Sequence, residues 1–196
     1  MDWIEEIPSA WKGHRQFAEW LVAEIKPGCI VELGVDFGYS SFVFAKALSP
    51  GIGKIYGIDL FQGDPHAGMR NTYDFVMEKI KEHSIETIEI IRGDFKEVST
   101  TWNKPINILH IDGFHTYDAV KSDFFAWAPF VLNDGVILFH DTAVQHFGIK
   151  DFFKEIGGIK LYFTHSFGLG VLTANKELVR KIKHNFTIFD FAQNPF

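Results

Sequence analysis

Two aspartates follow short apolar segments in the second half of the chain, and a histidine lies close to each of them. Asp112 directly follows the segment Ile106–Ile111. Asp141 comes after the segment 136–139, with His140 between them. If these segments are neighbouring parallel strands, the two carboxylates lie roughly 5 to 10 Å apart at one edge of a sheet. Carboxylates that face one crevice suit a magnesium ion that keeps several waters for substrate oxygens. Asp112 and Asp141 are therefore predicted metal ligands, and His140 is a candidate third ligand.

His115 lies in the polar stretch that follows Asp112 and is the predicted catalytic base, with Asp112 in the same reaction centre. An imidazole titrates near neutral pH, which suits removal of a proton from a hydroxyl group whose oxygen attacks a methyl group. A structural alternative stays open. In that alternative Asp112 caps a helix beginning near Tyr117, His115 is a loop residue, Asp141 accepts backbone hydrogen bonds, and His140 is a hydrogen-bonded structural histidine.

A glycine-bearing turn lies earlier in the chain, in the sequence ELGVDFGYS. Gly34 and Gly38 separate the apolar segment Cys29–Leu33 from residues 40–48, whose pattern indicates a helix. Glycines let the backbone turn sharply and approach a ligand closely, while Ser40 and the N-terminus of the helix offer hydrogen-bond donors. In open α/β sheets, ligands bind beside such a turn. The turn is therefore the predicted cofactor loop.

Acidic residues narrow the kind of cofactor that this loop can bind. The dinucleotide fingerprint GxGxxG fails, because Asp36 and Tyr39 stand at its second and third glycine positions. Asp36 would repel a pyrophosphate but suits a sulfonium cofactor that carries an ammonium group. Asp59, at the end of the next predicted strand, is placed to accept hydrogen bonds from two ribose hydroxyls. Asp94 is predicted to reach an adenine, with Phe95 packed on the ring.

The predicted cofactor-binding residues are Glu32, Gly34, Asp36, Gly38, Ser40, Asp59, Asp94 and Phe95. Most of them also have a structural alternative. The glycines are common turn residues, Asp59 is compatible with a solvated acid at a strand end, and Asp94 follows a glycine as acids in turns often do.

The segments that must position these residues alternate between strands and helices. Predicted strands cover Cys29–Leu33, 54–60, 87–91, Ile106–Ile111 and 136–139, and predicted helices cover residues 11–25, 40–48, 72–83 and 117–128. Strands joined by helical crossovers imply a parallel sheet covered on both faces. A helix at 149–156 and two closely spaced strands at 160–164 and 168–173 follow, and so short a gap permits only a hairpin. The predicted fold is α/β, a Rossmann-like doubly wound sheet, mostly parallel with a C-terminal antiparallel hairpin, in one domain over residues 1–196.

Composition excludes several other classes of protein. The 196 residues are 46% hydrophobic and include 21 Phe, which predicts a bulky core, and the formal charge of -6 without a Lys/Arg run argues against nucleic acid as a partner. Cys29 is the only cysteine, so neither an intramolecular disulfide nor a multi-cysteine zinc site is expected. The first residues lack a secretory signal and no apolar run is long enough for a membrane helix, so a cytoplasmic location without a membrane partner is expected.

These motifs resemble those of class I methyltransferases that use S-adenosylmethionine (SAM), and most closely those of methyltransferase family 24. The resemblance covers nearly the whole chain and rests on the stretches VELG at 31–34, DLFQGDPHAG at 59–68, IDGFHTYDAV at 111–120, FHDT at 139–142 and GLGVL at 168–172. The first loop is also similar to that of catechol-type O-methyltransferases. Asp64 and His66, in the second stretch, are candidate contacts to substrate or cofactor, with a helix cap and a surface histidine as the alternative.

The resemblance implies O-methylation. In catechol-type and macrolide-sugar O-methyltransferases the positions matching Asp112 and Asp141 hold magnesium, and in the sugar enzymes the position matching His115 is a candidate base. Two residues depart from these patterns: the catechol enzymes have a lysine in the block where His115 stands, and the sugar enzymes have an acid at position 140.

The sequence therefore predicts a SAM-dependent methyltransferase that acts on a hydroxyl of a sugar, glycan or small molecule, with Mg²⁺ assistance and homo-oligomer formation left open. One alternative is a catalytically silent SAM-binding or assembly module. Another is a nicotinamide-dependent oxidoreductase, which Asp36 disfavours.

Overall fold

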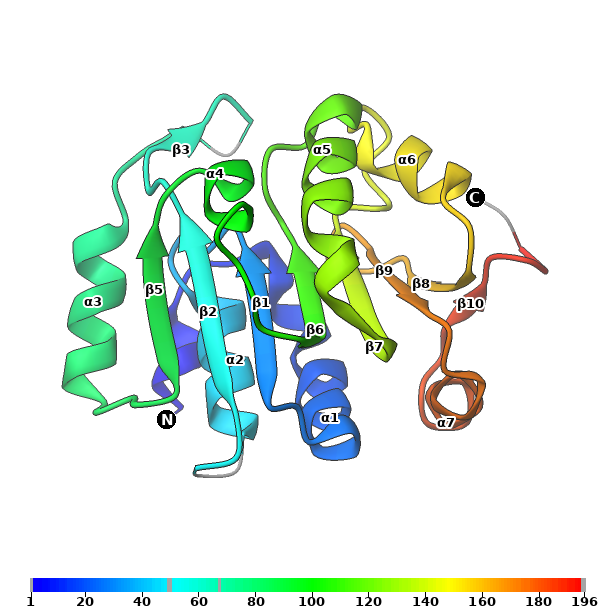
Figure 1. Cartoon of the computed structure of the whole chain (residues 1–196), viewed down its shortest axis with the longest axis horizontal. Coiled ribbons are helices and arrows are strands. Elements are labelled where there is room, and N and C mark those ends of the chain that lie inside the picture. The colour runs from blue at the N-terminus through cyan, green and yellow to red at the C-terminus, as the bar shows by residue number, and fades with distance from the viewer. Residues whose placement is uncertain (1, 49–50, 67, 195–196) are drawn as a thin grey trace.

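The computed structural model describes residues 2–48, 51–66 and 68–194. These residues form an eight-stranded sheet with the strand order β10-β8-β9-β7-β6-β1-β2-β5 (Figure 1). The strands of this sheet are β1 (Cys29–Leu33), β2 (Lys54–Asp59), β5 (Ile88–Arg92), β6 (Ile106–Ile111), β7 (Val131–His140), β8 (Ile159–Phe163), β9 (Leu169–Thr173) and β10 (Phe189–Asp190). Strands β5, β2, β1, β6 and β7 are parallel, while β9 pairs antiparallel with β7 and with β8. The predicted doubly wound sheet and its C-terminal hairpin are thus confirmed.

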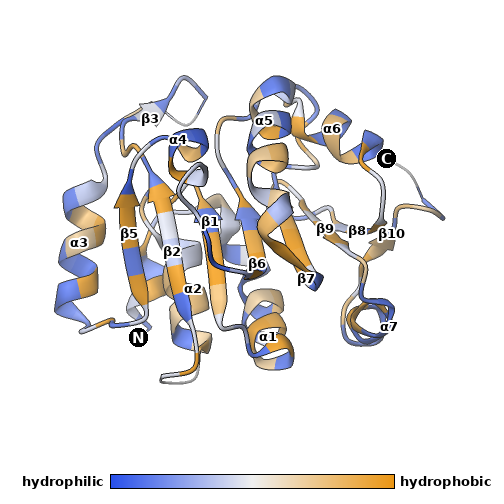
Figure 2. Cartoon of the chain, viewed as in Figure 1, coloured by the Kyte–Doolittle hydropathy of each residue, from blue (hydrophilic) through white to orange (hydrophobic). Residues whose placement is uncertain are grey.

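Helices cover both faces of the sheet because successive strand residues point to opposite sides. Ile30 and Ile108 belong to one buried cluster, and Val31 and Leu109, the next residue on each strand, belong to the other. The first cluster packs against α1 (Arg15–Ile25), α2 (Tyr39–Ala47), α3 (Tyr73–Glu82) and α7 (Lys176–Asn185). The second packs against α4 (Phe95–Ser99), α5 (Tyr117–Trp127) and α6 (Ile149–Glu155). Figure 2 shows the hydrophobic residues concentrated along the central strands.

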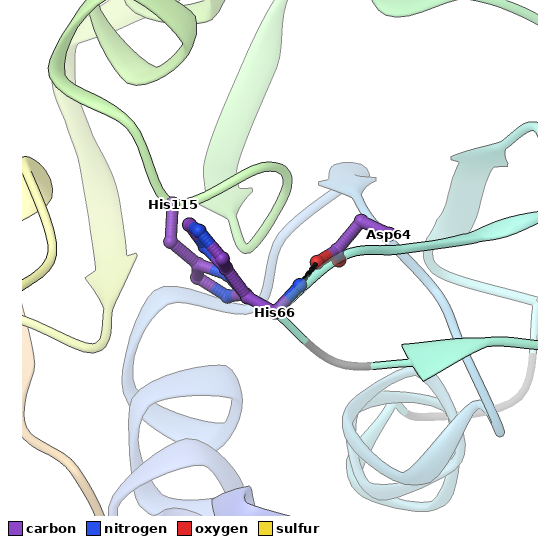
Figure 3. Close-up of side chains that lie close together, drawn as sticks. All are labelled: Asp64, His66 and His115. Carbon is purple, nitrogen blue, oxygen red and sulfur yellow. Dashed lines mark hydrogen bonds between the residues drawn. The ribbon is translucent and has the colours of Figure 1, made fainter.

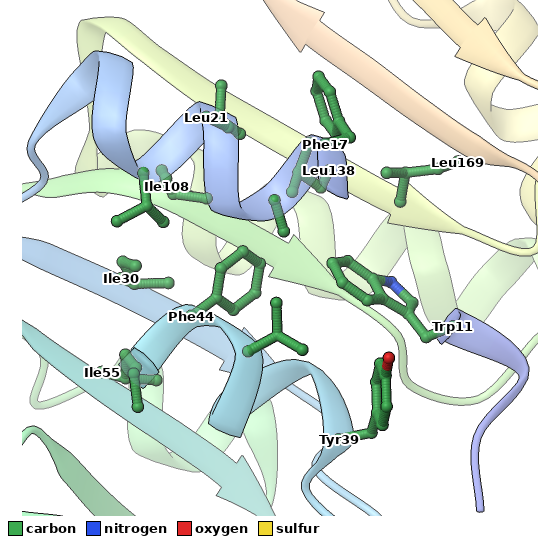
Figure 4. Packing of buried hydrophobic residues seen from close by; sticks show 14 of the residues in the cluster. Trp11, Phe17, Leu21, Ile30, Tyr39, Phe44, Ile55, Ile108, Leu138 and Leu169 are labelled. Carbon is green, nitrogen blue, oxygen red and sulfur yellow. The ribbon is translucent and has the colours of Figure 1, made fainter. Parts of the chain in front are cut away.

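Two short helical turns precede α1 and bring the N-terminal segment over the first cluster. They are the 3-10 helices η1 (Trp3–Glu6) and η2 (Ala10–His14). The α-helix predicted for residues 11–25 therefore begins only at Arg15, and Gly13, a poor helix former, lies in the part that is not α-helical. Figure 4 shows Trp11 among the buried residues of the first cluster, near Tyr39.

Other differences from the predicted elements are local. Strand β7 begins at Val131 rather than at residue 136, and its register opposite β6 is irregular in this first part. A small hairpin of β3 (Gly63–Asp64) and β4 (Gly68–Met69) follows β2. The 3-10 helix η3 (Ala128–Phe130) extends α5. Within the part of the chain that the structure describes, no helix has the length and apolar character needed to cross a membrane.

The topology fixes where a ligand can bind. From β1 the chain continues to β2 and β5 on one side, whereas β6 and β7 lie on the other side. The order of strands therefore reverses between β1 and β6, and their carboxyl ends form the crevice that α/β sheets of this kind use for ligands.

Candidate active site

The loop after β1 lies tightly against the end of β6 because Gly34 has no side chain. Gly34 has a φ of +93°, and its N–H donates to the carbonyl oxygen of Ile58 at 2.9 Å. A Cβ at this position would lie 2.0 Å from the backbone oxygen of Asp112. The left-handed conformation and the close approach both require glycine. The predicted cofactor loop is thereby held next to the predicted reaction centre.

Replacing Gly34 with alanine is expected to lower the free energy of unfolding by about 3 kcal/mol or more, because the strained φ and the clash with Asp112 add together. Gly51 provides a matched control, since it has a φ of +75° but no atom within 4 Å of the added Cβ. Urea unfolding of Gly34→Ala and Gly51→Ala measures the difference. If both variants lose the same free energy of unfolding, the contact with Asp112 contributes nothing to stability.

Glu32 lies beneath this loop and does not line the cavity described below. Its buried carboxylate accepts hydrogen bonds from the hydroxyls of Ser40 and Ser41 and from Nδ1 of His110 at 2.8 Å. Nε2 of His110 accepts from the indole N–H of Trp11 at 3.1 Å, so the imidazole carries its proton on Nδ1. The prediction of direct cofactor contact is therefore not supported for Glu32, which holds the start of α2 against β1.

Asp36 lines the cavity, but the chain already gives it a cationic partner. Nε and Nη2 of Arg70 donate to the two carboxylate oxygens at 2.9 and 2.5 Å, and the guanidinium lies 5.2 Å from the centre of the Phe37 ring. Sequence reasoning missed Arg70, which follows β4 and is far from Asp36 in the chain. Gly38 has a φ of +81° and is the N-cap residue of α2; it turns the chain but does not line the cavity.

Asp59 ties the loops after β1 and β2 to each other. Its Oδ2 accepts from the backbone N–H groups of Val35 at 2.7 Å and Asp36 at 3.0 Å, and its Oδ1 accepts from that of Phe61 at 2.6 Å. The carboxylate lines the cavity at the end of β2. Because a carboxylate can accept about four hydrogen bonds, capacity is left for a ligand.

A cavity of about 680 Å³ occupies the crevice and joins the two predicted groups of residues. This volume is within the range of small-molecule sites. Gly34, Asp36, Ser40, Asp59, Asp94 and Phe95 line it from the side of β1, β2 and β5. Asp112, His115, His140 and Asp141 line it from the ends of β6 and β7. The residues Pro8, Ser9, Ala10 and Trp11 add a wall from the N-terminal segment that the sequence did not predict.

At the ends of β6 and β7, His115 and Asp141 form a buried pair. Nε2 of His115 lies 2.8 Å from Oδ2 of Asp141, while Nδ1 is buried without a hydrogen-bond partner among the described residues. Burial would lower the pKa of His115, but the hydrogen bond to Asp141 and the charge of Asp112 outweigh it and the pKa is raised. Burial opposes ionisation of Asp141 as well, yet hydrogen bonds from His115 and His140 lower its pKa. One imidazole nitrogen is thus held by an acid, and the other has no hydrogen-bond partner among the described residues.

His140 bridges the two aspartates and a backbone carbonyl oxygen, and this arrangement does not support its prediction as a third metal ligand. Its Nε2 lies 3.1 Å from the carbonyl oxygen of Ser166, and its Nδ1 lies 3.2 Å from Oδ1 of Asp112 and 3.4 Å from Oδ1 of Asp141. Burial alone would lower the pKa of His140, but the charge of Asp112 and the hydrogen bonds to Asp112 and Asp141 raise it to about 10. Both ring nitrogens therefore face oxygen acceptors, an arrangement that favours a proton on each nitrogen.

The donor set that fits a divalent ion consists of Asp112, His115 and Asp141, whose ligand atoms lie within 4.8 Å of one another. Asp112 and Asp141 were predicted as this pair, and the structure brings them together. A second set with the same spacing is Asp64, His66 and His115. In Figure 3 the Asp64 and His66 side chains of the loop after β2 lie across from His115, and the backbone N–H of His66 donates to Asp64 at 2.6 Å. The rings of His66 and His115 are stacked with centroids 5.6 Å apart.

Comparisons with known proteins agree with this arrangement. The fold is that of class I methyltransferases: a candidate caffeoyl-CoA O-methyltransferase from Staphylococcus aureus superposes with a TM-score of 0.68 at 16% identity over 86% of each chain. An O-methyltransferase from Bacillus cereus, solved in complex with S-adenosylhomocysteine (SAH), gives a TM-score of 0.63 at 15% identity over 82% of this chain and 80% of that one.

The family is shown by the sequence match. The chain belongs to methyltransferase family 24, because the model of this methyltransferase domain matches residues 31–142. An uncharacterized Sinorhizobium fredii protein, y4gI, is 36% identical over 179 residues, which cover 87% of this chain and 20% of that protein. The chain therefore spans about one fifth of the length of this relative.

Proposed function

We propose that this domain transfers the methyl group of SAM to a hydroxyl oxygen of a sugar, glycan or other small-molecule acceptor. The observation that carries the proposal is the buried pair of His115 and Asp141 in the same cavity as the loop after β1, with Nδ1 of His115 unpartnered among the described residues. Family membership supports methyl transfer over hydride transfer to a nicotinamide. The SAH bound in the Bacillus cereus relative supports SAM as the donor.

In the proposed reaction, SAM binds against the ends of β1, β2 and β5, where Asp59 accepts from the ribose hydroxyls and Asp94 faces the adenine. The acceptor hydroxyl lies near Asp112 and donates to Nδ1 of His115. The oxygen attacks the methyl carbon as the carbon–sulfur bond breaks, and the hydroxyl proton passes to His115. The products are a methyl ether, SAH and a proton that the imidazole later releases. Asp141 holds the opposite nitrogen and keeps the ring oriented.

In the proposed reaction, the main contribution of the domain is to orient the acceptor hydroxyl relative to the methyl group of SAM. Holding a nucleophile and an electrophile in line removes much of the entropic barrier, and the buried His115 supplies the base at the point of attack. A magnesium ion held by Asp112 and Asp141 would add positive charge that favours the ionised hydroxyl.

The function is tested by calorimetric titration of the purified domain with SAM and SAH, followed by transfer of a radiolabelled methyl group to a panel of sugars, glycans and phenols. Binding together with acceptor-dependent SAH formation is the expected result. Absence of SAM binding would refute the proposal. Binding without transfer to any hydroxyl of the panel would instead identify a silent SAM-binding module.

His140 sets the affinity of the proposed metal site. Its cationic ring lies within 3.4 Å of Asp112 and Asp141 and so competes with Mg²⁺ for the same oxygens. His140→Asp, which restores the acid found in the sugar enzymes, is expected to strengthen Mg²⁺ binding at least about tenfold, because a positive charge is lost and an oxygen ligand is gained. Calorimetry with Mg²⁺ measures this change. The exposed His146 provides the control: His146→Asp introduces the same acid outside the cavity lining and should leave the affinity unchanged. An unchanged affinity in His140→Asp would exclude the site.

A further inference from the structure

An acid, Asp123, is buried in the apolar stripe of α5, and none of the described residues forms a hydrogen bond with it. Asp123 is only 9% exposed and accepts no hydrogen bond from any residue that the structure describes. It lies on the same face of the helix as the buried Val120 and Trp127. A buried polar group without a hydrogen bond destabilises a fold, so such an acid calls for a ligand. Asp123 lines the cavity, as does Ala119 one turn earlier.

Asp123, Gly113 and Phe95 line one part of the cavity together. A Cβ on Gly113 would lie 2.6 Å from Cε2 of Phe95 and 3.3 Å from Oδ2 of Asp123, so both side chains lie close to Gly113. Asp94 lines the same part of the cavity. Its Oδ1 accepts from the backbone N–H of Glu97 at 3.0 Å, as an N-cap does. This part of the cavity therefore combines an aromatic ring with two carboxyl groups.

Burial of the Asp123 carboxyl group favours its protonated form. Burial, and then the negative charge of Asp94, raise the pKa of Asp123 to about 7. Asp94 is the ionisable group whose charge acts on Asp123. A large fraction of the Asp123 side chains thus keeps a carboxyl proton near neutral pH. A neutral carboxyl group donates one hydrogen bond and accepts others, whereas an ionised one only accepts.

We propose that Asp123 is a specificity residue for the adenine of the cofactor, with its carboxyl O–H donating to a ring nitrogen and its carbonyl oxygen accepting from the 6-amino group. This inference rests on the proposed function, since it assumes that SAM occupies the cavity. Adenine offers an acceptor nitrogen beside an amino donor, which is the complement of a neutral carboxyl or amide group. Asp123 would thereby gain the hydrogen bonds that none of the described residues supplies.

The test compares two substitutions by calorimetric titration with SAH near pH 6. Asp123→Asn keeps one donor and one acceptor in the same shape, so its Kd should stay within about threefold of the wild-type value. Asp123→Leu removes both and should weaken binding about tenfold or more, the effect of losing a buried hydrogen-bonded contact. Asp118, exposed on the same helix, provides the control, and Asp118→Asn should bind SAH normally.

A pH series adds a readout that a packing role would not change. Between about pH 6 and about pH 9 the wild-type affinity for SAH should fall relative to that of Asp123→Asn, because only the wild-type group loses its proton. If wild-type protein binds no SAH, the proposed function fails and the inference fails with it. If wild-type protein binds SAH but Asp123→Leu binds equally well, only the inference fails. Equal weakening in Asp123→Asn and Asp123→Leu would also overturn it, since the ionised acid would then be required.

Discussion

Asp59→Ala is expected to abolish measurable SAM binding, weakening it by about a hundredfold or more. The Asp59 carboxylate accepts from Val35, Asp36 and Phe61 and so fixes the loops on both sides of the ribose position. The substitution removes these bonds together with the proposed acceptor of the ribose hydroxyls. Hydrogen bonds to a charged group contribute about 1.5–3 kcal/mol each, so losing two to the cofactor suffices for the expected change. Calorimetric titration with SAM measures it.

Two controls separate loss of the contact from loss of the fold. Asp74 is exposed on α3, and Asp74→Ala should bind SAM as the wild type does. Asp59→Asn keeps one acceptor oxygen and should show an intermediate affinity, and thermal unfolding should show that each variant is folded. Normal SAM binding by folded Asp59→Ala would refute the cofactor assignment.

His115→Gln is expected to reduce kcat by about 10²–10⁴-fold, the range typical of lost general-base catalysis, while leaving the affinity for SAM unchanged. Glutamine can still donate to Asp141 but cannot take the hydroxyl proton. The Nδ1 atom of His115 is buried and unpartnered among the described residues, so no other described group holds this nitrogen. The measurement is initial-rate kinetics with the best acceptor from the panel.

His146 provides the matched control for this substitution. It is exposed, and its ring contacts Phe147, on which His115 also stacks. His146→Gln should keep wild-type kcat. If His115→Gln keeps wild-type kcat as well, the base is another group, and the buried pair with Asp141 is structural.

The parts of the fold that sequence predicted well are those with strong local signals. The apolar segments of β1 and β6 are bounded by polar and turn residues, and both strands begin and end where predicted. Helix α7 was missed because only Leu178, Val179 and Ile182 are buried among charged neighbours. Helix α4 was missed although Asp94 followed by Glu97 is a cap pattern, because Asp94 was interpreted as a ligand contact or a turn residue.

The candidate site also contains features that the sequence could predict and features that it could not. Asp112 and Asp141 come together because the carboxyl ends of adjacent parallel strands meet at one edge, and this could be deduced from spacing. The bonding of Asp36 to Arg70 could not, because it depends on how a loop folds back over the cavity. The orientation of His140 depends on the carbonyl oxygen of Ser166, which comes from a later segment of the chain. The role of a residue that depends on contacts between distant segments of the chain can be assigned only from the structure.

The hydrogen bonds from Trp11 to His110 and from His110 to Glu32 also constrain any exchange of parts between relatives. Trp11 lies outside the segment 31–142 that matches the family, yet its indole N–H donates to Nε2 of His110, which lies within that segment. A chimaera that receives a foreign N-terminal segment without a donor at this place would leave His110 with an orphaned acceptor in the core. The N-terminal wall of the cavity and the cofactor loop would therefore have to be exchanged together in any such chimaera.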